Sequence, residues 1–379
     1  MSEQTWKVPL SDVTLRPELS EAAADVVASG WWSMGPKVAE FEAAFAEEID
    51  VRHAYAVANG TAALHLALLA LDCGPGDEVI VPSLTFVAAA NTIRRVGATP
   101  VFCDIVGDGD LNLDPEDLAR ARSPSTRAIV VLHYGGFACD MGAVLKLARQ
   151  AGIAVIEDAA HAPGSRWDAR FCGAIGDVGC FSFFSNKNLP VGEGGMIVTD
   201  RADVADRTRL LRSHGMTTLT WDRHRGHAST YDVVVPGLNY RLDEMRAAMG
   251  LVQLGFLAEE NAARARLARA YADALHGVNG YTMAFADRLG EPTSAHHLAV
   301  ALAPDPESRD DIRARLAERR IQTSVHYPPI HRFSAYQGIQ PSRALPRTED
   351  AAARAITLPL FARMTDADVD LVVDALLER

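Results

Sequence analysis

The chain has 379 residues, of which 48% are hydrophobic and 23% are charged, and its formal net charge at pH 7 is −12. The acidic balance argues against a nucleic-acid binder, because proteins of that class need a basic face. No apolar run is as long as a membrane span and the first residues, MSEQTWKVPLSD, contain no signal-peptide core, so we expect a cytoplasmic protein. The five cysteines form no Cys-x-x-Cys pair, which predicts reduced thiols rather than a disulfide framework or a structural zinc site.

Residues 1–30 are typical of an N-terminal arm followed by a helix. A glycine-flanked loop then contains two adjacent tryptophans, Trp31 and Trp32. Two indole rings suit either a lid over a site or a packing plug, and both interpretations stay open. A second helix is predicted over residues 37–49, where apolar residues recur at helical spacing.

From residue 53 the chain alternates between predicted strands and helices. The strands cover residues 54–58, 78–81, 99–105, 129–133, 153–157, 179–184 and 196–199, and the helices cover residues 62–71, 86–96 and 141–150. Strands this rich in Val and Ile cannot expose one face to water, so they favour a mainly parallel sheet with helices on both sides. Ligands of such sheets bind beyond the carboxyl ends of the strands, which makes the residues directly after each strand the candidates.

After residue 240 the pattern changes to longer helices and isolated strands. The predicted elements are one or two helices over residues 241–274, a strand over 297–302 and helices over 309–320 and 366–377. We therefore predict an α/β protein with a large domain at residues 1–250 and a smaller C-terminal α/β domain at residues 251–379.

Lys187 follows the predicted strand 179–184 and precedes a glycine-rich reversal into strand 196–199. A lysine at a strand end can be the imine-forming amine of a pyridoxal phosphate (PLP) enzyme. Most lysines are surface residues, so a solvated loop lysine is the alternative.

Three other polar positions follow predicted strands. The Asn59-Gly60-Thr61 turn opens a helix and can bind phosphate through free N–H groups, although a plain N-cap looks the same. Asp158 can face the pocket as the anion that keeps a pyridine nitrogen protonated. His161 would lie close to Asp158, or it is a core histidine with its hydrogen bonds satisfied.

Two residues add an aromatic surface and a hydroxyl. Phe86 can stack on a flat ring, and otherwise belongs to the core. Ser182, five positions before Lys187, can donate a hydrogen bond to phosphate.

These positions belong to motifs that occur in a characteristic order, NGTAAL, GPGDEVIVPSLTF, EDAAH, FSFFSNKNLPVGEGG and GLNYRLDE. In that order they resemble the DegT/DnrJ/EryC1/StrS family of PLP-dependent aminotransferases, densely over residues 30–255 and more loosely beyond. The resemblance implies a fold-type I PLP-dependent transferase that forms homodimers with active sites at the subunit interface. It also implies nucleotide-linked keto-sugars or keto-cyclitols as substrates.

The resemblance assigns roles to the residues that match the motifs. Lys187 is then the lysine that binds PLP and moves the proton, Asp158 is the partner of the pyridine nitrogen, and Phe86 stacks on the ring. Some relatives that remove a hydroxyl group have histidine in place of the lysine. Because Lys187 is present here, transamination is favoured.

The remaining cofactor contacts are also carried over by position. Gly60, Thr61 and Ser182 match the phosphate-binding positions, and His161 lies where relatives have His or Gln beside the cofactor. Asn239 matches an asparagine that reaches the phosphate from the other subunit.

The function implied is transfer of an amino group from glutamate or glutamine to a keto-sugar, preferably one linked to a nucleotide diphosphate, in amino-sugar or antibiotic biosynthesis. A keto-cyclitol acceptor and a non-catalytic PLP-binding regulatory protein are the alternatives. The presence of both Lys187 and Asp158, without a basic face, favours the enzyme.

The candidate substrate contacts share a position in the loops expected around the acceptor: Trp32, Arg212, Arg223, Arg225, His326 and Tyr327. The arginines belong to a basic segment suited to pyrophosphate, which guanidinium groups bind in a bidentate fork, although a solvated basic loop would look similar. We expect no metal site, because the nearby histidines lack further ligands at suitable spacing.

Overall fold

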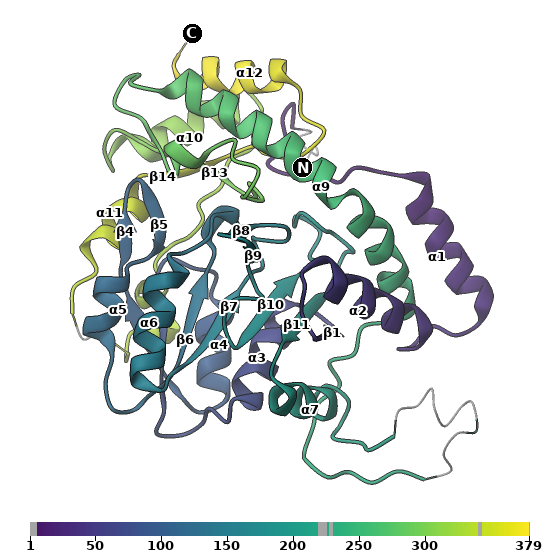
Figure 1. Ribbon diagram of the computed structural model, residues 1–379. Helices are drawn as coiled ribbons and strands as arrows, with labels where there is room; N and C mark the ends of the chain where they lie inside the picture. Colours follow the sequence, from purple (N-terminus) through teal and green to yellow (C-terminus); the bar gives the residue numbers. More distant parts are fainter. Residues whose placement is uncertain (1–5, 219–225, 227–229, 340–342, 379) are drawn as a thin grey trace.

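The computed structural model describes residues 6–218, 226, 230–339 and 343–378. A seven-stranded sheet with the order β1-β11-β10-β7-β6-β2-β3 forms its centre (Figure 1). The strands are β1 (His53–Val57), β2 (Glu78–Pro82), β3 (Thr99–Cys103), β6 (Thr126–Leu132), β7 (Ala154–Asp158), β10 (Val178–Ser182) and β11 (Gly195–Thr199). β11 runs antiparallel to β1 and β10, and the other neighbours are parallel. The predicted, mainly parallel α/β fold is confirmed.

Both faces of the sheet are buried, because successive side chains of each strand enter opposite hydrophobic clusters. In β2, Val79 and Val81 join one cluster, and Ile80 joins the other. The first cluster contains α3 (Gly60–Ala70), α4 (Ala88–Arg95) and α7 (Ala202–Leu211). The second contains α2 (Pro36–Glu48), α5 (Pro115–Ala121) and α6 (Met141–Ala151) (Figure 1). The sheet is therefore the middle layer of three.

The predicted strand at residues 99–105 ends earlier, at Cys103. The chain turns at Asp104, whose N–H donates to Asp117 Oδ2 (2.8 Å) and whose Oδ1 accepts from the N–H of Ile105 (3.0 Å). A hairpin of β4 (Ile105–Gly107) and β5 (Asp110–Leu113) follows, which the sequence analysis did not predict.

The predicted helical region after residue 240 is one helix, α9 (Glu244–Leu275), of 32 residues. At about 1.5 Å per residue it is about 48 Å long. Ala247 and Leu257 pack in the second cluster of the sheet, whereas Leu267 and Tyr271 pack in a third cluster. The division into 1–250 and 251–379 stays a prediction, and a boundary at residue 250 would fall inside α9.

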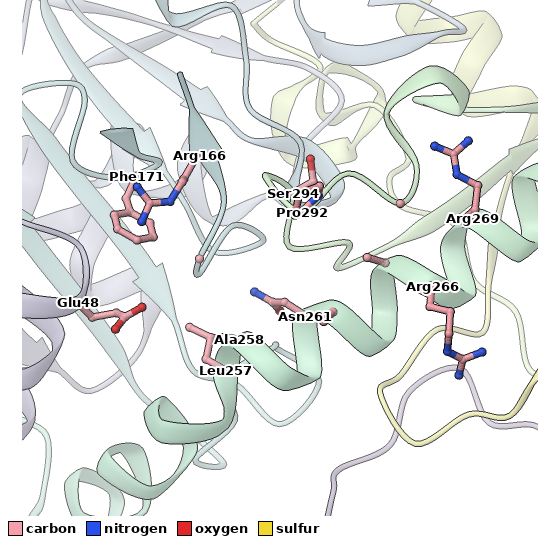
Figure 2. A pocket seen from close by; sticks show the side chains of 14 residues that line it. Glu48, Arg166, Phe171, Leu257, Ala258, Asn261, Arg266, Arg269, Pro292 and Ser294 are labelled. Atoms are coloured by element: carbon pink, nitrogen blue, oxygen red, sulfur yellow. The ribbon is translucent and has the colours of Figure 1, made fainter. Parts of the chain in front are cut away.

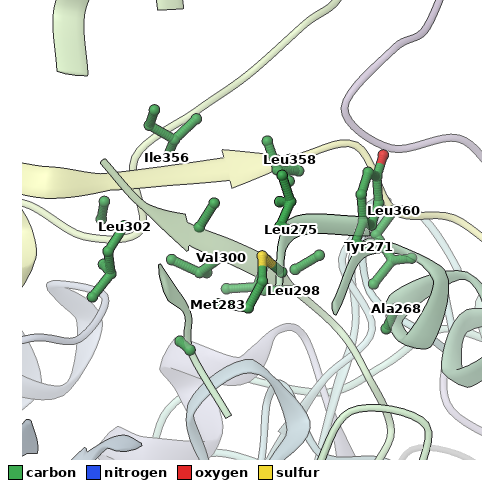
Figure 3. Packing of buried hydrophobic residues seen from close by; sticks show 14 of the residues in the cluster. Ala268, Tyr271, Leu275, Met283, Leu298, Val300, Leu302, Ile356, Leu358 and Leu360 are labelled. Atoms are coloured by element: carbon green, nitrogen blue, oxygen red, sulfur yellow. The ribbon is translucent and has the colours of Figure 1, made fainter. Parts of the chain in front are cut away.

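The third cluster is the core of the C-terminal part. It joins α9 to an antiparallel sheet of β12 (Thr282–Met283), β13 (Ala299–Leu302) and β14 (Ala355–Leu358), and to α10 (Ser308–Glu318) and α12 (Asp366–Leu376). Figure 3 shows side chains of β13 and β14 beside Tyr271 and Leu275 of α9. α11 (Pro346–Arg354) adds Ala351 and Ala352 to the same cluster, and α1 (Pro17–Ser29) packs against α9. Val8, near the N-terminus, belongs to the same cluster, so this part of the N-terminal segment packs on the C-terminal part of the chain.

All five cysteines lie in the described part of the chain, and each is buried and unpaired. Among the helices of that part, none has the length and apolar character that crossing a membrane requires.

The buried carboxylate of Glu244 joins the start of α9 to the start of α2. Its oxygens accept hydrogen bonds from the N–H groups of Gly35 (2.9 Å), Lys37 (2.8 Å) and Val38 (2.9 Å). The first N–H groups of a helix have no partner within the helix, and a carboxylate at this end also complements the helix dipole.

Replacing Glu244 with alanine should therefore lower the free energy of unfolding by about 3 kcal/mol, because three buried or partly buried N–H groups lose a charged acceptor. Urea denaturation followed by circular dichroism measures the change. Glu40→Ala, on the exposed face of α2, is the control and should change stability by less than about 0.5 kcal/mol. Equal effects of the two substitutions would show that Glu244 does not hold the two helices together.

Candidate active site

A cavity of about 390 Å³ opens at the carboxyl ends of β1, β7 and β10. Its lining brings together Gly60, Thr61, Phe86, Asp158, His161, Ser182, Lys187, His326 and Tyr327, all of which the sequence analysis selected. A larger cavity, of about 660 Å³, lies between α9 and the loops around Arg166 and Pro292 (Figure 2). No predicted site residue lines the larger cavity, so the smaller one is the candidate site.

Lys187 is held just beyond the end of β10. Its backbone N–H donates to Phe184 O (2.8 Å), and its Nζ lies 3.3 Å from Nε2 of His297. Burial lowers the pKa of Lys187 to about 8, although the charge of Asp158 acts in the opposite direction. A substantial fraction of this amine is therefore neutral, and nucleophilic, near pH 8.

Asp158 ends β7 and is buried, with its Oδ1 accepting a hydrogen bond from the N–H of Ala160 (3.1 Å). Burial raises the pKa of Asp158, against the opposing effects of the Ala160 N–H, Lys187 and His133. The preceding residue, Glu157, accepts from the N–H groups of residues 173, 175 and 176 and lies 2.8 Å from Nε2 of His133. These contacts fix the strand end that carries Asp158.

The start of α3 forms the opposite wall. The Asn59 side chain caps the helix by accepting from the N–H of Ala62 (2.9 Å), and the N–H groups of Gly60 and Thr61 have no partner within the helix. A Cβ atom on Gly60 would lie 2.9 Å from Cβ of Ser182, and one on Gly195 would lie 2.6 Å from the backbone carbon of Asn59. Glycine at both positions therefore allows β10 and β11 to approach a helix start that is suited to an anion.

Aromatic rings form the rest of the wall. Phe86 is 55% exposed, and its ring centre lies 5.9 Å from that of Tyr327. The buried His161 accepts at Nδ1 from the N–H of Gly135 (3.3 Å), so its Nε2–H faces Tyr327 Oη at 2.9 Å. Burial, with added effects of Lys187 and His326, lowers the pKa of His161 well below its usual value, and the ring is neutral.

His326 lines the same cavity, with Nδ1 at 2.9 Å from Oγ1 of Thr357. Burial and the charge of Lys187 lower the pKa of His326 to about 4. Apart from Lys187, the cavity wall formed by the described residues therefore carries no positive charge at neutral pH.

The other predicted contacts do not line this cavity. Asn239 is exposed and pairs with Ser213 in an isolated bridge, and Trp32 is 55% exposed, with Nε1 donating to Val27 O (3.3 Å). Arg212 is a correction to the expected basic cluster. It is buried, pairs with Glu42 and donates to Ala56 O (2.8 Å), so its guanidinium cannot reach a substrate.

Arg223 and Arg225 lie outside the described residues.

The sequence analysis missed His297, which belongs to the strand predicted over residues 297–302. A histidine doublet before an apolar strand was the available signal. It says nothing of a contact with Lys187, which lies 110 positions earlier in the chain.

The fold is α/β, and the site places a buried lysine amine beside a helix start that is suited to an anion. The family model described as the DegT/DnrJ/EryC1/StrS aminotransferase family matches residues 13–377. The chain belongs to this aminotransferase family, as the resemblance of its motifs predicted.

Individual relatives match over nearly the whole chain. The spore coat polysaccharide biosynthesis protein SpsC of Bacillus subtilis (strain 168) is 40% identical, over 97% of this chain and 96% of its own. The structure of DesI in the presence of its TDP-sugar product is 35% identical with a TM-score of 0.87, covering 99% of this chain and 93% of that one. The PLP-form of the putative sugar aminotransferase Spr1654 from Streptococcus pneumoniae is 27% identical, with a TM-score of 0.90 and 98% coverage of both chains.

Proposed function

We propose that this protein is a PLP-dependent sugar aminotransferase that moves an amino group from glutamate or glutamine to a nucleotide-diphosphate-linked keto-sugar. The observation that carries the proposal is that Lys187, Asp158, Phe86 and the start of α3 line one cavity of about 390 Å³. Each of the four provides a different function that such a cofactor needs.

The residues of the cavity fit PLP. The N–H groups of Gly60 and Thr61 are free of intrahelical partners and would bind its phosphate together with Ser182. Phe86 exposes an apolar ring that would stack on the pyridine, and the buried Asp158 would pair with the ring nitrogen. The PLP-form of Spr1654, which has the same fold, supports this assignment.

When bound, PLP supplies an electron sink for the charge that develops when a substrate carbon loses a proton. Lys187 would take that proton at Nζ from the α-carbon of the donor, and would return a proton to the acceptor carbon in the second half of the reaction. Its lowered pKa, about 8, makes the neutral amine available for both roles. Asp158 would stay anionic beside a protonated ring nitrogen, because that pairing favours its charged form.

The acceptor class is supported by the relatives, since DesI is solved with a TDP-sugar product and SpsC is a polysaccharide biosynthesis protein. A pyrophosphate needs positive charge, which the cavity wall lacks apart from Lys187 among the described residues. We propose that Arg223 and Arg225 take this role, whereas Arg212 is buried and paired with Glu42. A keto-cyclitol, which carries no phosphate, remains the alternative acceptor.

We further propose that the protein works as a cytoplasmic homodimer. Phe86 and Phe184 stand exposed at the cavity, and Val233 and Val234 are exposed near Asn239 in the sequence. Exposed large apolar side chains of this kind are typical of a surface that a second subunit covers. Asn239 would then complete the phosphate site of the neighbouring subunit.

Replacing Lys187 with alanine should remove the visible absorbance of the lysine-bound cofactor and slow amino transfer about a thousandfold or more, because the proton-moving amine is lost. Absorbance spectra and a single-turnover assay with glutamate measure both effects. Lys146→Ala, on the exposed side of α6, is the matched control and should behave as the wild type. Donor turnover at the native rate in Lys187→Ala would refute the proposal.

Subunit sharing predicts complementation between two inactive variants. Mixed dimers of Lys187→Ala and Asn239→Ala should recover activity above either parent, because one site of each mixed dimer carries both lesions and the other carries neither. Activity is assayed after subunit exchange, with exchange verified by native mass spectrometry. Absence of recovery in verified mixed dimers would argue against sharing.

A nucleotide diphosphate without its sugar should compete with the acceptor at about millimolar concentration, where a site of about −4 kcal/mol is half filled. Added salt, Arg223→Ala or Arg225→Ala should weaken this competition, because charge attraction is screened or removed. Inhibition kinetics measure the effect. Turnover of scyllo-inosose-like ketones without competition by the nucleotide would instead identify the cyclitol as the acceptor.

A further inference from the structure

The buried imidazole of His297 connects Lys187 to a chain of amide side chains. Its Nε2 lies 3.3 Å from Nζ of Lys187, and its Nδ1 lies 3.0 Å from Oδ1 of Asn188. We propose that His297 is a positioning residue for Lys187: Asn188 fixes the ring so that an unprotonated Nε2 accepts a hydrogen bond from the lysine amine.

The hydrogen bonds of Asn188 determine which nitrogen of His297 carries the proton. Its Nδ2 donates to Oδ1 of Asn261 (2.8 Å) and to Ala295 O (2.7 Å). Both amide hydrogens are thereby used, and the amide oxygen faces His297. An amide oxygen only accepts, so Nδ1 of His297 must be the donor, and in the neutral ring Nε2 carries the lone pair.

Asn261 anchors this arrangement to the long helix α9. Its Nδ2 donates to Pro163 O (2.9 Å), which leaves its Oδ1 to accept from Asn188. Figure 2 shows Asn261 on α9 next to Leu257 and Ala258. Gly164 lies against this side chain, and only glycine fits there, because a Cβ on residue 164 would lie 2.7 Å from Nδ2 of Asn261. The orientation of the imidazole therefore depends on tertiary packing, because it is set through Asn188 and Asn261, which are 73 positions apart in the sequence.

Burial, with added effects of nearby groups, keeps the His297 ring neutral. Burial lowers the pKa of His297 well below its usual value, and Lys187, His161, Arg264 and His326 lower it further. The ring therefore accepts a hydrogen bond from Lys187 without taking its proton away. One N–H of the neutral Lys187 amine is directed at Nε2 of His297. The lone pair of the amine therefore points away from His297 and stays available for chemistry in the cavity.

This contact affects how Lys187 titrates. Burial lowers the pKa of Lys187 and Asp158 opposes that shift. A hydrogen bond from the ammonium to a neutral acceptor favours the charged form, so its loss should lower the pKa of Lys187 further. Losing a hydrogen bond to a charged group of this kind should shift the pKa of Lys187 by about one unit or more.

The inference rests on the proposed function for the importance of Lys187, but its test needs neither cofactor nor substrate. The full-length chain, freed of cofactor, is labelled briefly with an amine reagent such as acetic anhydride between about pH 6 and about pH 10. Mass spectrometry of the peptide that contains Lys187 then gives its titration curve. In the wild type the midpoint should lie at about 8.

Three variants test the contact. His297→Phe keeps a ring but removes the acceptor, and should lower the midpoint by about one unit. His297→Gln restores an oxygen acceptor and should bring the midpoint most of the way back. His296→Phe is the control and should leave it unchanged, because His296 bonds instead to Ser294 O (2.7 Å) and the N–H of Gly290 (3.0 Å).

Asn188→Ala provides an independent test that leaves His297 in place. It frees the ring to adopt the other tautomer and should lower the midpoint in the same direction by a smaller amount. This variant decides the question if His297→Phe does not fold. An unchanged midpoint in the folded variants would overturn the inference, whereas loss of amino transfer in Lys187→Ala bears only on the proposed function.

Discussion

The structure of the site depends on the close approach between the first turn of α3 and the ends of β10 and β11. Gly60 and Gly195 permit this approach, since a side chain at either position would overlap Ser182 or the backbone of Asn59. The approach places a helix start, with its partial positive charge, at the edge of the sheet where Lys187 and Asp158 also lie. One packing constraint therefore places a helix start suited to an anion and the lysine at the same edge of the sheet.

Burial then determines the chemistry of the groups that surround the cavity. It lowers the pKa values of Lys187, His161, His297 and His326 and raises that of Asp158, so each group is displaced toward its neutral form. The cost of burying these groups is offset by fixed partners such as Ala160, Gly135 and Asn188. The result is an amine that can gain or lose a proton near neutral pH, surrounded by histidines that do not compete for that proton.

Apart from Lys187, the described cavity wall does not supply the positive charge that the proposed nucleotide-linked acceptor needs. Arg212, which the sequence placed in a basic cluster, is instead paired with Glu42 and supports β1 through Ala56. The described wall of the cavity fits the proposed cofactor, and we assign the proposed substrate contacts to Arg223, Arg225 and a second subunit. Such a division allows one cofactor site to serve many acceptors, because loops vary without disturbing the sheet.

The sequence by itself determined the mainly parallel sheet and the choice of Lys187, Asp158 and Gly60, which follow strands, as candidate site residues. These features are local: apolar runs and glycine turns form where the side chains adjacent in sequence dictate them. Only the tertiary structure decided that α9 runs unbroken through residue 250, that Arg212 is buried, and that His297 meets Lys187. Each of these depends on contacts between residues far apart in the chain, and periodicity carries no information about which distant side chain will be the partner.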